Sequence, residues 1–138
     1  MVMVGYLLDT NTCIQLLTNR SLRVKQRFWS LPPSYLKLCS VVKAELEYGA
    51  RHSQRVTENL ALLEKFYAPL ESLPFDDLSA KQYAIIREEL ACQGQVISHN
   101  DLMIAAIAKA YQLTVVTHNT KEFVRVTGLL IEDWEIAK

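Results

Sequence analysis

Residues 2–11 of the chain read VMVGYLLDTN, an apolar run that ends abruptly in three polar residues. The run from Val2 to Leu8 is continuous and partly β-branched, which predicts a strand buried on both faces. Asp9, Thr10 and Asn11 each carry a side chain that can cap a following helix. A buried strand leading directly into a helix is the first half of a parallel α/β unit.

The same alternation of strand and helix recurs along the rest of the chain. Strands are predicted at residues 35–39, 69–75, 114–117 and 129–131, and helices from about 14, then at 22–31, 40–52, 57–67, 79–92, 99–111 and 119–126. We expect Ser40 and Ser98 to cap helices and Gly94 to end one. The fold class is therefore α/β, with a mostly parallel sheet of four to five strands. In such sheets ligands bind beyond the carboxyl ends of the strands.

Length and composition restrict the class of protein. The 138 residues fit a single domain, 1–138, and a content of 50% hydrophobic residues excludes a disordered chain. Three widely spaced cysteines form no disulfide framework, which favours a reducing cytoplasm. The first apolar run is too short for a signal segment or a membrane span, so we expect a soluble cytoplasmic protein with no membrane partner.

Several carboxylates are placed to reach the carboxyl ends of the strands. Asp9 follows the first strand, and it is either a helix cap or a ligand-binding residue. Asp101 lies in the first turn of a very apolar helix, where dipole complementation is the alternative to a functional role. Glu45 and Glu47 lie on different faces of their helix, and spacing alone does not choose between them. Carboxylates of this kind suit a hard cation such as Mg²⁺ or Mn²⁺.

Basic residues are concentrated in the first half of the chain. Residues 1–69 carry nine Lys and Arg against five Asp and Glu, whereas residues 70–138 carry six against ten. Arg20, Arg23 and Arg27 form a cluster, and Lys43 follows further along the chain. These residues are either a solvated surface or a face for a phosphate-rich partner such as RNA.

Four motifs together resemble the PIN-domain ribonucleases, and more narrowly the VapC toxins of bacterial toxin–antitoxin pairs. They are LLDTN at 7–11, AELxxG at 44–49, NDLxIAA at 100–106 and THNxxEF at 117–123, where x is any residue. The resemblance extends from residue 5 to about residue 135. It implies a three-layer α/β/α sandwich, an acidic site for Mg²⁺ or Mn²⁺, and metal-dependent cleavage of RNA, most often tRNA or rRNA. It also implies a homodimer and a small VapB-like antitoxin as partners.

The resemblance assigns roles to individual residues. It places Asp9, Glu45 and Asp101 in the metal site, and so favours Glu45 over Glu47. Many relatives have an acid where this chain has the neutral Asn119, which therefore joins the catalytic set as a residue that can hold a ligand or water. Glu122 is the candidate to replace the missing charge.

The expected reaction is hydrolysis of a phosphodiester by metal-activated water. Asp9 and Asp101 would bind the metal directly, and Glu45 would bind it directly or through water. Thr10 and Thr117 would hydrogen-bond to the phosphate or to water.

Three other functions remain open at this point. A haloacid-dehalogenase-like phosphatase would use Asp9 as a nucleophile, but it needs a second aspartate where this chain has Asn11. The other two are a catalytically inactive PIN-fold module that binds RNA or protein, and a nuclease that cuts DNA.

Overall fold

A computed structural model of the chain describes residues 5–136 and contains one five-stranded sheet. The strands are β1 (Tyr6–Leu8), β2 (Leu36–Cys39), β3 (Glu71–Leu73), β4 (Thr114–Val116) and β5 (Ile131–Glu132). Their order is β3-β2-β1-β4-β5, and every neighbouring pair is parallel. The predicted fold class is thus confirmed, with an all-parallel sheet. Residues 2–4 of the first predicted strand lie outside the described residues.

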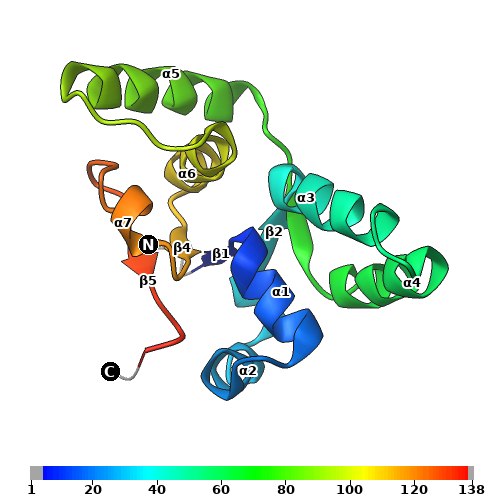
Figure 1. Cartoon of the computed structure of the whole chain (residues 1–138). Helices are drawn as coiled ribbons and strands as arrows, with labels where there is room; N and C mark the ends of the chain where they lie inside the picture. Colours follow the sequence, from blue (N-terminus) through cyan, green and yellow to red (C-terminus); the bar gives the residue numbers. More distant parts are fainter. Residues whose placement is uncertain (1–4, 137–138) are drawn as a thin grey trace.

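Helices cover both faces of this sheet, as the predicted three-layer sandwich requires (Figure 1). They are α1 (Thr10–Thr18), α2 (Leu22–Trp29), α3 (Ser40–Arg51), α4 (Val56–Tyr67), α5 (Asp77–Cys92), α6 (His99–Tyr111) and α7 (Thr120–Phe123), with a short 3₁₀ helix at Pro33–Tyr35. In Figure 1, α5 and α6 pack together above the sheet, whereas α1 and α2 lie below it. Helix α3 packs against α1 and α4.

Several helix boundaries differ from the sequence prediction; α2 ends at Trp29 and not at residue 31, and α7 spans Thr120–Phe123 and not 119–126. Helix α1 begins at Thr10, a turn before residue 14, because Asp9 caps it. Helix α5 begins at Asp77 because the side chain of Asp76 caps it. The prediction that Ser40 caps α3 is wrong. Its hydroxyl accepts a hydrogen bond from the backbone N–H of Phe75, so it joins α3 to the segment after β3 instead.

Two predicted helix ends are confirmed. The hydroxyl of Ser98 accepts a hydrogen bond from the backbone N–H of Asp101 at 3.2 Å, which caps α6. Gly94 has a φ of +67°, a left-handed conformation that glycine adopts without strain, directly after α5.

The core explains why the functional crevice forms at one edge of the sheet. Leu7, Leu8 and Val115 are fully buried on the central strands β1 and β4, as expected for a sheet covered on both faces. The chain builds β1, β2 and β3 outward in one direction and then places β4 on the other side of β1. Ligands of parallel sheets bind where the strand order reverses in this way. The residues that follow β1 and β4 are therefore expected to form the binding crevice.

Two further sequence expectations concern the setting of the protein. Cys13 and Cys39 are buried, Cys92 is exposed, and all three are free thiols. Over residues 5–136, no helix combines the length and the apolarity needed to cross a bilayer.

Candidate functional site

Asp9 lies at the carboxyl end of β1 and has a structural role of its own. Its Oδ1 accepts a hydrogen bond from the backbone N–H of Thr12 at 2.9 Å, so the predicted helix cap is confirmed. The residue is only 5% exposed. Burial raises the pKa of its carboxyl group, and the nearby charge of Glu45 adds to this, while hydrogen bonds from Thr117 and Thr12 oppose it.

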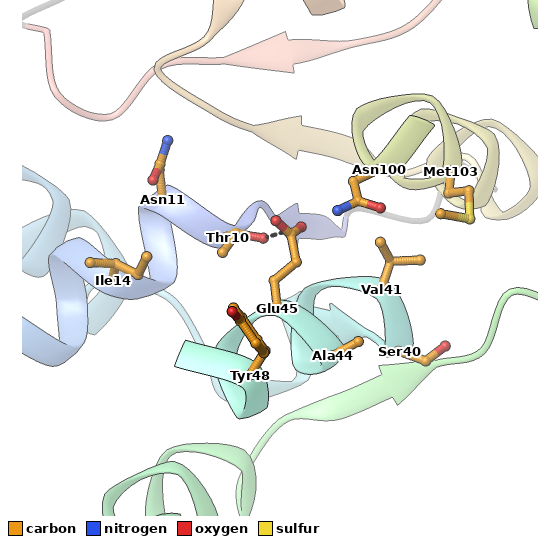
Figure 2. A pocket seen from close by; sticks show the side chains of 10 residues that line it. All are labelled: Thr10, Asn11, Ile14, Ser40, Val41, Ala44, Glu45, Tyr48, Asn100 and Met103. Carbon is orange, nitrogen blue, oxygen red and sulfur yellow. Dashed lines mark hydrogen bonds between the residues drawn. The ribbon is translucent and has the colours of Figure 1, made fainter. Parts of the chain in front are cut away.

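Glu45 reaches the same region from α3. Its Oε1 accepts a hydrogen bond from the Thr10 hydroxyl at 2.8 Å, which links α3 to the first residue of α1 (Figure 2). Glu47 instead accepts a hydrogen bond from the hydroxyl of Tyr67 at 2.9 Å, on another side of the helix. The choice of Glu45 over Glu47, which spacing left open, thus agrees with the direction in which each side chain points.

Asp101 enters the crevice from the first turn of α6. Burial, a hydrogen bond with Glu122, and the charges of Glu122 and Asp9 raise the pKa of its carboxyl group to about 7. The pKa of Glu122 is lowered, chiefly by the same hydrogen bond. The two carboxyl groups therefore interact, and Asp101 is the one whose affinity for a proton is raised.

Asn119 connects these two acids. Its Nδ2 donates hydrogen bonds to Oδ2 of Asp101 at 3.2 Å and to Oε2 of Glu122 at 2.9 Å. Asn119 directly precedes α7, but its side chain makes no capping hydrogen bond to that helix, because the amide faces the carboxylates instead. Its backbone N–H donates to the hydroxyl of Thr117, which is 1% exposed and directly follows β4.

The crevice therefore brings together the seven predicted residues of the catalytic, metal and positioning sets. They come from the turns after β1 and β4 and from α1, α3, α6 and α7: Asp9, Thr10, Glu45, Asp101, Thr117, Asn119 and Glu122.

The chemistry of the donor set suits a divalent cation. Asp9 and Asp101 both hold a proton more tightly than ordinary aspartates, partly because another carboxylate lies close to each of them. A cation in the same place would remove this mutual repulsion. All available donor atoms are oxygens, which are the ligands that Mg²⁺ and Mn²⁺ prefer.

The predicted basic cluster divides into two parts. Arg20 and Arg23 are exposed and available to a partner. Arg27 is partly buried, because its guanidinium lies over the rings of Tyr6 and Trp134 and donates to the Tyr6 hydroxyl at 3.3 Å. Lys43 is likewise engaged, with Nζ 4.4 Å from the centre of the Tyr67 ring.

Two groups of residues near the crevice were not predicted from the sequence. His118, after β4, hydrogen-bonds through Nδ1 to Oδ2 of Asp133 at 2.9 Å and lies 3.5 Å from a carboxylate oxygen of Glu135. These acids raise the pKa of the imidazole. Asn100 and Tyr48 line an open pocket of about 790 Å³ that also contains Glu45 (Figure 2). The sequence could have indicated both residues, because Asn100 directly precedes Asp101 and Tyr48 follows Glu45 by one helical turn.

Comparison with known proteins agrees with this geometry. The family model described as PIN domain matches residues 6–129. A protein of Shigella flexneri, named tRNA(fMet)-specific endonuclease VapC, is 42% identical over 132 residues, covering 96% of this chain and 99% of that protein.

Solved structures give the same result. The DNA-bound VapBC complex of Salmonella typhimurium contains a chain with a TM-score of 0.89 and 41% identity, covering 96% of this chain and 99% of that one. The VapBC2 complex of Rickettsia felis, bound to a promoter DNA fragment, contains a chain with a TM-score of 0.87 and 34% identity. The match covers 94% of the chain described here and 98% of that one. The chain described here therefore belongs to the PIN-domain family and, within it, to the VapC ribonucleases.

Proposed function

We propose that this chain is the toxin of a type II toxin–antitoxin pair and acts as a metal-dependent endoribonuclease. The observation that carries the proposal is the convergence of Asp9, Glu45 and Asp101 where the strand order reverses, with the pKa values of both aspartates raised. Proteins of similar length and sequence are named ribonucleases. A haloacid-dehalogenase-like phosphatase is not supported, since Asn11 stands where that chemistry needs an aspartate.

In the proposed site, Asp9 and Asp101 hold Mg²⁺ or Mn²⁺, and Glu45 joins them directly or through water. When bound there, a divalent cation would supply positive charge against the phosphodiester and would lower the pKa of a water molecule. Glu45 then orients the attacking water and accepts its proton. The hydrogen bond from Thr10 engages one oxygen of Glu45, and within residues 5–136 the other accepts no hydrogen bond.

The neighbouring polar residues position the substrate and the acids. Asn119 holds Asp101 and Glu122 in place through its two hydrogen bonds. Thr117, bonded to both Asp9 and the backbone of Asn119, orders the turn after β4. Arg20 and Arg23 are two exposed cations of the basic first half, and we propose that they contact the RNA backbone.

We propose tRNA as the substrate, in the cytoplasm. The relative from Shigella flexneri is named for cleavage of tRNA(fMet), which is accordingly the first tRNA to test. A phosphodiester enzyme without a sequence-reading motif needs a folded RNA to present one bond, and tRNA offers single-stranded loops of this kind.

The test of the proposed function is incubation of the purified protein with total bacterial RNA and, separately, with DNA of mixed sequence. We expect RNA cleavage in Mg²⁺ or Mn²⁺, none in EDTA, and none by Asp9→Asn. Cleavage of DNA alone would favour the DNA nuclease alternative. Failure to cut either polymer, combined with tight RNA binding, would favour the inactive module.

We also propose a small VapB-like antitoxin as the protein partner, because similar solved chains come from complexes described as VapBC. A second pocket of about 260 Å³, lined by Ile14, Leu17, Leu62 and Leu63, extends from Glu45 along α1, α3 and α4. An apolar segment bound there would adjoin the acidic crevice. Leu62→Glu should therefore weaken inhibition by the antitoxin encoded beside this chain, whereas Leu22→Glu on α2 should not.

We propose a homodimer as the active form. Leu78 and Ile85 are exposed and seven residues apart on α5, so they share one face of that helix. Sedimentation of the protein and of Ile85→Glu tests this: the variant should sediment as a monomer. A wild-type protein that is monomeric at all concentrations would contradict the proposal.

A further inference from the structure

The pocket beside Glu45 is large enough to take part of a substrate. It has a volume of about 790 Å³, within the range of pockets that hold small molecules and cofactors. Figure 2 shows its walls, formed by α1, α3 and the start of α6. Because Glu45 lies in this wall, any group bound in the pocket lies beside the bond that the acidic crevice would cut.

The lining of this pocket suits a nucleobase better than a phosphate. Apart from Glu45 it contains no charged side chain; its apolar members are Ile14, Val41, Ala44, Tyr48 and Met103, and its polar members are Thr10, Asn11, Ser40 and Asn100. Without Lys or Arg, it has no cation for a phosphate. The amides of Asn11 and Asn100 are both exposed and can pair with the edge of a base.

Tyr48 is an aromatic side chain in this pocket that core packing does not explain. It follows Glu45 by three residues on α3, so both side chains lie on the same face of the helix. The side chain is 68% exposed, and among the described residues its hydroxyl has no hydrogen-bond partner. One face of its ring stacks on the ring of His52, with centroids 5.6 Å apart and planes 13° apart.

The His52 ring lies nearly parallel to the Tyr48 ring and offset from it. An exposed tyrosine with one face covered by a parallel ring offers its other face to a second flat partner. Unpaired RNA bases are recognised in this way, because they stack on aromatic side chains that already occupy their bound position. In Figure 2 the Tyr48 ring stands beside Glu45 rather than pointing away from the pocket.

We propose that Tyr48 is the stacking platform for the RNA base next to the scissile phosphate. The inference rests on the proposed ribonuclease function and adds a binding contact to it. The acidic crevice takes the phosphodiester, and the neutral pocket takes the adjacent base. Cleavage is thereby restricted to places where that base is unpaired and can leave its stack, as in tRNA loops.

The variants that test this are Tyr48→Ala, Tyr48→Phe and the matched control Trp29→Ala. Trp29 is an aromatic residue with 73% exposure on α2, outside the pocket. The probe is whichever tRNA the wild-type protein cleaves, beginning with tRNA(fMet). Binding is measured by fluorescence anisotropy in an Asp101→Asn background, where the tRNA stays intact. Cleavage is measured with Asp101 present.

We expect Tyr48→Ala to weaken tRNA binding about fivefold or more, because loss of one base–aromatic stack costs about that much or more. Tyr48→Phe keeps the ring and should stay within about threefold of the starting protein, since only the hydroxyl is lost. Trp29→Ala should bind as before. Melting temperatures of all three should be close to that of the starting protein, because both aromatic side chains are exposed.

The proposal and the proposed function fail in different ways. If the wild-type protein cleaves tRNA and Tyr48→Ala binds and cleaves it equally well, the stacking platform is overturned while the ribonuclease stands. If Tyr48→Ala leaves tRNA binding intact but weakens inhibition by the antitoxin, the ring is a protein contact and the proposal is again overturned. A wild-type protein that neither binds nor cleaves any tRNA overturns both.

Discussion

The side-chain amide of Asn119 donates a hydrogen bond to Oδ2 of Asp101 at 3.2 Å, although the two residues are 18 positions apart in the chain. The same nitrogen donates to Glu122 at 2.9 Å. A neutral amide thus donates to one oxygen of each of two carboxyl groups that also interact with each other. An aspartate at this position would lack donor hydrogens and would add a further negative charge to the crevice.

Asn119→Asp should consequently make the metal-free protein less stable and the metal-bound protein comparatively more stable. Repulsion between charges about 4 Å apart costs about 1 to 4 kcal/mol near a protein surface, so the melting temperature in EDTA should fall by several degrees. Added Mn²⁺ should raise it by more than in the wild type. Asn119→Ala, which removes the donors without adding charge, is the control and should respond less to Mn²⁺. If the melting temperature of Asn119→Asp in EDTA equals or exceeds that of the wild type, this account is contradicted.

Glu45 and Glu47 provide a matched pair for the catalytic role. Glu45→Gln should reduce the rate of tRNA cleavage about 100-fold or more, because the side chain can no longer accept a proton. Glu47→Gln should cleave at close to the wild-type rate, since Glu47 bonds to Tyr67 away from the crevice. Both substitutions keep side-chain shape, so rates measured at equal folded fraction compare function directly. Equal loss of activity in the two variants would show that Glu45 has no special role.

The raised pKa of Asp101 should make the stability of the protein in EDTA depend on pH. Its pKa is about 7 in the folded protein and near 3.8 in the unfolded chain. Between these values the folded state keeps a proton that the unfolded state has lost, so stability falls as the pH rises from about 4 to about 7. The lowered pKa of Glu122 acts only below its usual range and does not reverse this.

Asp101→Asn removes that titration. The variant should therefore melt higher than the wild type in EDTA, by more at about pH 8 than at about pH 5, and it should gain less from Mn²⁺. If Asp101 merely complemented the dipole of α6, its replacement would cost up to about 1 kcal/mol, most of all at high pH. Melting curves at both pH values distinguish the two cases. The melting temperature of the variant rises above that of the wild type if Asp101 titrates as described, and it falls below if Asp101 only complements the helix dipole.

Substitutions of Arg20 and Arg23 should affect RNA binding, whereas substitution of Arg27 should affect the stability of the fold. Arg20→Gln with Arg23→Gln should weaken RNA binding and flatten its salt dependence, because exposed cations release counterions when they meet phosphates. Arg27→Gln should instead lower the melting temperature, since the guanidinium packs on Tyr6 and Trp134 and lies 3.9 Å from Glu132. Affinity across a salt series, measured for both proteins, tests this. An unchanged salt slope in the double variant would leave Arg20 and Arg23 as a solvated surface only.

Much of the fold and of the crevice could be predicted because the signals are local. Continuous apolar runs gave the buried strands, and a polar residue directly after such a run lies at the carboxyl edge whatever the tertiary details. Asp9 illustrates the point, since the residue that caps α1 also faces the crevice. Glu45 needed the family motif, because spacing of two residues in a helix leaves both faces equally plausible.

What could not be predicted depends on contacts between distant segments. Ser40 has the composition of a helix cap, yet it bonds to Phe75, which only the pairing of β2 with β3 brings near. Arg27 reads as part of a basic cluster, but its position over Trp134 requires the last strand to return beside β4. His118 and Asp133 meet for the same reason. No local pattern encodes these contacts.

The central claim, that water activated at the acidic crevice cleaves RNA, is tested most directly by the chemical ends of the products. Hydrolysis by water should leave a 5′-phosphate and a 3′-hydroxyl, with cleavage present in Mn²⁺ and absent in EDTA. A reaction that uses the 2′-hydroxyl of the substrate would leave a 2′,3′-cyclic phosphate instead. We predict 5′-phosphate ends that ligase can join and that disappear in Asp9→Asn. Cyclic phosphate ends, formed equally well in EDTA, would contradict the account.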